Sequence, residues 1–151
     1  YQKDFVHAKL LLSQSQSATQ GANMEVSLQT LPQYEKLAKE IAKSWSNIGI
    51  KTNIKAVETL PSNFQAFLGD FRLPKDPDQY TLWHSGQVNN ITKYKNLRID
   101  KLLEDGRQTD DVGTRIKIYA DFQKYLLDDA PATFLYFSNS YTVTRNSVSQ
   151  M

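Results

Sequence analysis

Three side chains in the middle of the sequence have the chemistry of a small hydrolytic site. Asp76 and Asp78 flank a proline, and His84 follows six residues later. A histidine can act as a general base, and neighbouring carboxylates can hold a divalent cation. A calcium loop needs roughly six to eight oxygen ligands, however, and no Asp, Asn and Gly residues alternate in this region. The sequence therefore favours a simpler role, in which an aspartate begins a helix at Asp76 or Asp78.

Other catalytic motifs are absent from the sequence. The chain has no cysteine, which excludes disulfides, thiolate catalysis and cysteine-based metal sites. Its two histidines lie far apart, and its six glycines occur singly, so there is no phosphate-binding loop. We therefore expect no cofactor, no metal site and no enzymatic activity, and keep a hydrolase built on Asp76, Asp78 and His84 as the alternative.

The segment 76–94 has the composition of a ligand-binding surface. It combines aromatic side chains with side-chain amides and has few large aliphatic residues; the aromatic and amide residues are Gln79, Tyr80, Trp83, His84, Gln87, Asn89, Asn90 and Tyr94. Such a mixture suits a ligand that is partly apolar and partly amide. Alternatively, Tyr80 and Trp83 lie three residues apart on one face of a helix and belong to the core. The segment alone leaves both interpretations open.

A strand–helix–strand unit precedes this segment. Alternation of apolar and polar residues predicts strands at about 24–30 and 50–57. Between them, apolar residues recur at three- and four-residue steps, which predicts a helix. Thr30 and Gln33 match a capping box, and Gly49 suits the left-handed position after the helix. A unit of this length predicts parallel strands with a right-handed crossover. The expected fold class is α/β, with a mixed sheet built on this βαβ unit.

Further elements flank the unit. The predicted ones are a helix at 5–12, a flexible polar linker at 13–23, a third strand within 58–73, a helix beginning near Ile99, a helix at about 112–128 capped by Asp110 or Asp111, and closing strands at 132–137 and 141–144. A length of 151 residues suits one domain. The net charge of +2 comes from interspersed charges, so we expect no nucleic-acid partner.

Several short motifs follow one another in a characteristic order. They are Asp76-Pro-Asp-Gln-Tyr, Leu82-Trp-His-Ser, Asn90-Ile-Thr, Ile99-Asp-Lys-Leu-Leu and Asp128-Asp-Ala-Pro, after an Ile-Gly-Ile turn at 48–50. This ordered set resembles the second lobe of the peptide- and oligopeptide-binding proteins that feed ABC importers. The resemblance covers about residues 5–145.

The resemblance implies a two-lobe receptor outside the cytoplasmic membrane. Such a receptor encloses a peptide or similar small solute between lobes that close about a hinge, docks on a membrane permease and performs no chemistry. Residues 1–151 would then form a single periplasmic-binding-protein-like domain, the C-terminal lobe. The missing N-terminal lobe of the same protein would be its partner. The sequence leaves open whether the parent protein is lipid-anchored.

The resemblance also implies a set of ligand contacts. Trp83 and Tyr80 would stack on the ligand, and His84, Gln79 and Asn90 would make polar contacts. An extended edge formed by Phe71, Arg72 and Leu73 would hydrogen-bond to a peptide backbone, with Arg72 available to a carboxylate.

One position departs from the family pattern. In well-known relatives, an aspartate just ahead of the Asp-Pro segment pairs with the amino terminus of the ligand, and Leu73 stands there instead. Recognition of that terminus is therefore expected to differ. A third interpretation is a protein-interaction domain, whose exposed aromatic face would form a flat patch on the order of several hundred Å².

Overall fold

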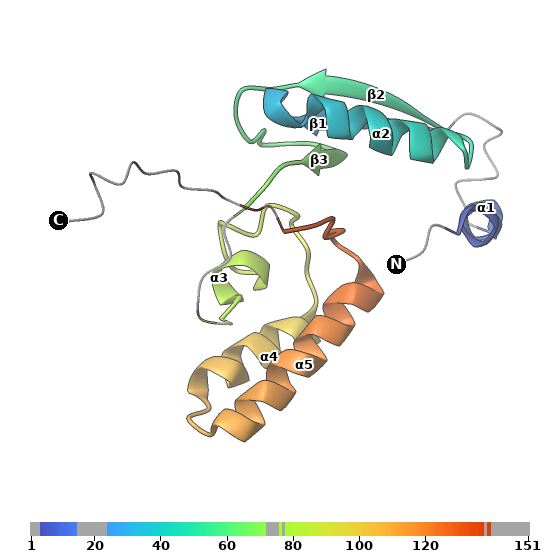
Figure 1. Ribbon diagram of the computed structural model, residues 1–151. Coiled ribbons are helices and arrows are strands. Elements are labelled where there is room, and N and C mark those ends of the chain that lie inside the picture. The colour runs from blue at the N-terminus through green and yellow to red at the C-terminus, as the bar shows by residue number, and fades with distance from the viewer. Residues whose placement is uncertain (1–3, 15–23, 72–75, 77, 138, 140–151) are drawn as a thin grey trace, which may run out of the picture. The chain divides into compact units, whose positions relative to one another are not determined.

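The computed structural model describes residues 4–14, 24–71, 76, 78–137 and 139. The chain forms two compact units, unit 1 (Tyr1–Arg72) and unit 2 (Leu73–Met151). Figure 1 shows the elements of both. The expectation that residues 1–151 form a single lobe is not tested by the units taken separately.

Unit 1 contains a three-stranded parallel sheet. The strands β1 (Met24–Thr30), β2 (Ile50–Ala56) and β3 (Ala66–Leu68) lie in the order β2-β1-β3. In the observed register, Thr30 lies opposite both Ala56 and Leu68. These strands confirm the predicted βαβ unit, its parallel pairing and the strand expected within 58–73. The α/β fold class is also confirmed, and all pairings among the described strands are parallel.

A helix covers one face of this sheet (Figure 1). A short 3-10 turn, η2 (Pro32–Tyr34), leads into α2 (Glu35–Ser46). Because β1 and β2 are parallel and in register, their inward-facing residues share the face that α2 packs on. The buried centre consists of Leu28, Ala38 and Leu68, with Tyr34, Leu37, Ile41, Trp45, Ile54 and Ala66 packed around it. The amphipathic pattern of the sequence thus accounts for this core.

The start of α2 differs from the prediction. The capping box of Thr30 and Gln33 is wrong, because the helix begins only at Glu35 and has no side-chain cap. The fully buried Thr30 hydroxyl instead donates a hydrogen bond to the Leu68 carbonyl at 3.1 Å. The end of the helix is as expected, since Gly49 follows it with a φ of 90°.

The N-terminal helix α1 (Phe5–Gln14) confirms the helix predicted at 5–12. It extends two residues into the predicted linker at 13–23. The rest of that linker lies outside the described residues. No residue of α1 is buried.

Unit 2 is helical in its described part. The elements are α3 (Tyr80–Trp83), α4 (Leu97–Gln108) and α5 (Val112–Asp129), with α4 and α5 side by side (Figure 1). The Asn96 side chain accepts hydrogen bonds at the start of α4, and Asp111 caps α5 as predicted. The buried core consists of Trp83, Ile99, Leu103, Tyr119, Phe122 and Leu126. None of the described helices has the length and apolar character needed to cross a membrane.

Of the two predicted closing strands, the one that lies in the described part of the chain is not observed. Residues 132–137 have no strand structure, so that prediction is wrong, and residues 141–144 lie outside the described residues. A strand forms only when a neighbouring strand takes its hydrogen bonds, and the described part of unit 2 contains none. The four apolar residues from Phe134 to Phe137 therefore stay exposed.

Candidate functional site

The first strand of unit 1 lies in the middle of its sheet, between β2 and β3. All three described strands are parallel, so their carboxyl ends lie at one edge. In open α/β sheets, ligands bind outside the carboxyl ends of the strands. Phe71, one of the predicted ligand contacts, follows the carboxyl end of β3 and is 48% exposed. Its predicted neighbours Arg72 and Leu73 lie outside the described residues.

The carboxyl ends of the three strands are held firmly together. The Thr30 hydroxyl binds the Leu68 carbonyl, and the Val57 amide donates to the Thr30 carbonyl at 2.9 Å. A Cβ atom at Gly69 would lie 2.6 Å from Cε1 of Phe67, so a larger residue there would displace the Phe67 ring. Phe71 follows this hydrogen-bonded edge of the sheet.

In unit 2, Tyr80 and His84 form a stacked pair. Their ring centroids are 4.2 Å apart, and the Arg107 guanidinium lies 4.1 Å from the Tyr80 centroid. Both distances are too short for the two groups to share one face, so they cover opposite faces of Tyr80. The ring faces of Tyr80 are therefore occupied within unit 2, and only its edge and hydroxyl remain for a ligand.

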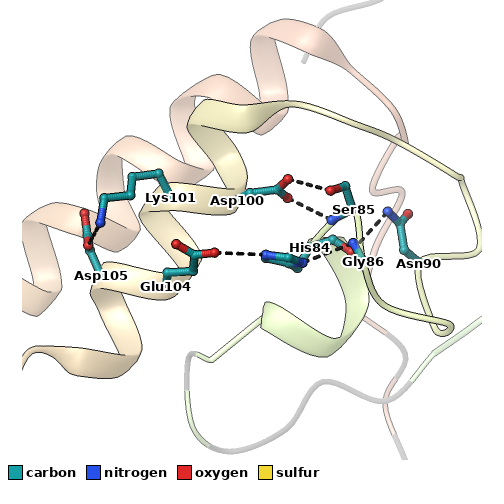
Figure 2. A network of polar contacts seen from close by, with 8 residues as sticks. All are labelled: His84, Ser85, Gly86, Asn90, Asp100, Lys101, Glu104 and Asp105. Atoms are coloured by element: carbon teal, nitrogen blue, oxygen red, sulfur yellow. Dashed lines mark hydrogen bonds and ion pairs between the residues drawn. The ribbon is translucent and has the colours of Figure 1, made fainter.

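Both ring nitrogens of His84 have partners (Figure 2). The Gly86 amide donates to Nδ1 at 3.1 Å, and Nε2 lies 3.3 Å from a carboxylate oxygen of Glu104. Because Nδ1 accepts, the proton of the neutral ring sits on Nε2 and points to Glu104. His84 is thus oriented by its own unit, and its role as a polar ligand contact stays a prediction.

The two aspartates of the alternative hydrolase are paired with arginines. Asp76 Oδ1 lies 2.7 Å from Nη2 of Arg115, and Asp78 Oδ2 lies 2.7 Å from Nη2 of Arg107. Hydrogen bonding from Arg115 holds the pKa of Asp76 below its usual range. Asp78 also accepts the amide of Tyr80, the first residue of α3, at 2.9 Å. This geometry favours the helix-starting role over catalysis.

Nor do the acidic and histidine side chains gather elsewhere. Among the described residues, no three His, Cys, Asp or Glu side chains are placed to share a metal ion.

Trp83 and Asn90 are buried at 6% exposure each. Trp83 belongs to the core of unit 2, which is the packing role that its helical spacing to Tyr80 left open. The Asn90 amide donates to the Tyr94 carbonyl at 2.7 Å, and Thr92 donates to its oxygen at 3.0 Å. These contacts give both residues a structural function. Ligand contact by them, and by the half-buried Gln79, remains untested.

A buried carboxylate that the sequence did not reveal supports the loop after α3. Asp100 accepts the amide of Ser85 at 2.8 Å and its hydroxyl at 2.6 Å, as Figure 2 shows. Asp100 is only 8% exposed. In the sequence, Asp100 stands between Ile99 and Lys101 on a helix with an apolar face. That position was the one sign that its carboxylate is buried. The segment of binding-type composition is therefore anchored to α4.

A second network anchors the end of the same loop. The Tyr94 hydroxyl donates to Asp129, and the Asn96 amide donates to Asp129 at 2.7 Å. Burial, followed by the hydrogen bond to Asp129, raises the pKa of Tyr94 to about 12. The same contacts lower the pKa of Asp129. Asn96 joins this network to the start of α4.

Several known proteins are similar to this chain in sequence and in fold. No family model matches the chain. The oligopeptide-binding protein AppA of Bacillus subtilis is 31% identical over 119 residues, which cover 71% of this chain and 22% of that protein. The structure of AppA in complex with a nonapeptide matches with a TM-score of 0.66 and 26% identity, over 72% of this chain and 24% of that one.

Two further structures match more of the chain. The ABC transporter substrate-binding protein CtaP of Listeria monocytogenes gives a TM-score of 0.77 at 26% identity, covering 86% of this chain and 29% of its own. The ABC transporter-associated periplasmic binding protein DppA of Helicobacter pylori, in complex with the peptide STSA, gives 0.75 at 26% identity, covering 87% and 28%.

The resemblance noted in the sequence is thereby confirmed. The homologues and structural neighbours of this chain are oligopeptide- and dipeptide-binding proteins of ABC importers, and its fold is that of periplasmic-binding-protein-like solute-binding proteins. The chain spans about a quarter of the length of the relatives named above.

Proposed function

We propose that this chain is part of a peptide receptor of an ABC importer. The whole protein binds a peptide or similar small solute between two lobes and delivers it to a membrane permease. The observation that carries the proposal is the hydrogen-bonded carboxyl edge of the parallel sheet, with the exposed Phe71 just after β3, in a chain whose homologues are peptide-binding proteins.

The proposed contacts lie at the carboxyl edge of unit 1 and beside α3. Phe71, Arg72 and Leu73 supply an extended edge for the peptide backbone. Gln79 supplies an amide, and Tyr80 and His84 contribute their ring edges. Trp83 and Asn90 support the segment around α3 from within unit 2, consistent with their burial.

The receptor acts outside the cytoplasmic membrane and performs no catalysis. The similarity to DppA, a periplasmic binding protein of Helicobacter pylori, supports the location, and the similarity to peptide-binding proteins supports a non-enzymatic role. Docking on a permease follows from the importer class. Anchoring by a lipid is compatible with this location, as is a free receptor.

A titration tests the proposed function. We expect the 151-residue chain to bind the peptide Ser-Thr-Ser-Ala weakly, because one lobe supplies about half of the contacts of a micromolar complex. Half of about −8 kcal/mol corresponds to a Kd near 1 mM, on the order of the value to be measured by amide chemical shifts. A micromolar Kd would show that one lobe suffices, and no shift at residues 57–60 or 69–71 would contradict the proposal.

The alternative hydrolase has its own test. We expect no turnover of esterase or phosphatase substrates, with or without divalent metal, because Asp76 and Asp78 each form an ion pair with an arginine. Turnover that disappears in the His84→Ala variant would overturn the receptor interpretation. Turnover that persists in that variant would point to a contaminating enzyme.

A further inference from the structure

Two large apolar side chains of unit 1 are exposed at the same edge of its sheet. Within residues 24–71, all of which the structure describes, only Leu60 and Phe71 among the large hydrophobic residues stay exposed, at 46% and 48%. Leu60 follows the carboxyl end of β2, and Phe71 follows that of β3. Every other large apolar side chain within residues 24–71 is at least partly covered. Leu60 and Phe71 thus share both their exposure and their place after the carboxyl end of a strand.

The strand order sets the spacing of the strand ends that these two residues follow, Leu60 by four residues and Phe71 by three. Since β2 and β3 flank β1, their carboxyl ends are separated by two strand spacings, about 10 Å. An extended peptide advances about 3.3 Å per residue. A peptide that crosses the edge would therefore pass both strand ends within about three residues.

We infer that Leu60 and Phe71 are specificity-determining residues that favour apolar side chains in the bound peptide, an inference that rests on the proposed function. A polar peptide leaves both side chains facing water. A peptide with apolar residues about three positions apart buries apolar surface against each of them. Removing one such contact corresponds to about a three- to tenfold loss of affinity.

Two tetrapeptides test this preference on the 151-residue chain. Ser-Thr-Ser-Ala and Leu-Thr-Ser-Leu are titrated against the ¹⁵N-labelled chain, and binding is followed through amide chemical shifts. We expect the leucine peptide to bind more tightly. Leu60→Ser should weaken its binding about three- to tenfold and change that of the polar peptide by less than about twofold. Phe71→Ser should weaken the binding of the leucine peptide by a similar factor.

Val88→Ser is the matched control, because it removes an apolar side chain that is 96% exposed in unit 2. It should change neither affinity. If both peptides bind and neither serine substitution at the edge alters the preference, the specificity role is wrong while the proposed function stands. If neither peptide shifts an amide of residues 57–60 or 69–71, the proposed function itself fails.

Discussion

At the scale of single residues, each of the two aspartates in unit 2 that resemble a catalytic pair is bound to an arginine. Asp76 is bound by Arg115, which also donates to the Gly106 carbonyl at 3.0 Å. Asp78 is bound by Arg107, which covers Tyr80. The segment before α3 is therefore tied to α5 through Asp76 and to α4 through Asp78.

The Asp76–Arg115 ion pair makes the free energy of unfolding depend on pH in the acidic range. The pKa of Asp76 is lower in the folded protein than in the unfolded chain, because Arg115 donates to it. Its contribution is therefore present above the unfolded pKa of about 3.9 and is lost as the pH falls through the folded pKa. We expect Asp76→Asn to lose less stability than the wild type between about pH 5 and pH 3, as measured by urea denaturation.

Glu58→Asn serves as the control for this measurement, because no described residue pairs with Glu58. Its acid dependence should match that of the wild type. An identical acid dependence in Asp76→Asn and the wild type would show that the ion pair is not stabilising in solution.

At the scale of elements, the contact between α4 and α5 depends on a buried glycine. Gly106 faces Tyr119, and a Cβ atom there would lie 3.0 Å from Cζ and 3.1 Å from the hydroxyl oxygen. Those atoms belong to a buried side chain that cannot easily shift. A side chain at position 106 would therefore crowd Tyr119 at the contact between α4 and α5.

Gly106→Ala tests this packing. Alanine favours a helix by about 1 kcal/mol, but overpacking against Tyr119 should cost about 1–3 kcal/mol, so we expect no gain or a net loss of stability. Gly113→Ala is the control, since its nearest contact is at 3.4 Å, and should be neutral or stabilising by up to about 1 kcal/mol. Equal stabilisation in both variants, measured by chemical denaturation, would contradict the packing argument.

Elements with a clear period could be predicted from the sequence, whereas long-range partners could not. The strands at 24–30 and 50–57 and the helices were predictable because apolar residues repeat every two or about 3.6 positions. Thr30 matched a capping box, but its hydroxyl bonds to Leu68, 38 residues away. The segment 132–137 has the composition of a strand, yet a strand also requires a neighbour.

The candidate site shows the same limit. Residue types in the segment 76–94 indicated binding chemistry, but the types alone do not reveal which side chains are used internally. Trp83 fills the core, and Tyr80 lies against Arg107, 27 positions further along. Leu60 and Phe71 became recognisable only once the strand order placed them at one edge.

At the scale of the whole molecule, the chain aligns with only about a quarter of the length of its relatives. A receptor that encloses its ligand between two lobes divides the contacts between them. One lobe alone then keeps the geometry of its half-site but loses most of the affinity. We therefore expect the 151-residue chain to bind a peptide weakly, but through specific residues.

We propose that the carboxyl edge of the parallel sheet faces the peptide. A spin label attached to Ser-Thr-Ser-Ala tests this orientation, because the label broadens the amide signals of nearby residues even in a weak complex. We expect broadening at Leu31, residues 57–60 and residues 69–71. Broadening confined to the opposite, amino-terminal ends of β1 and β2, or to α2, would contradict it.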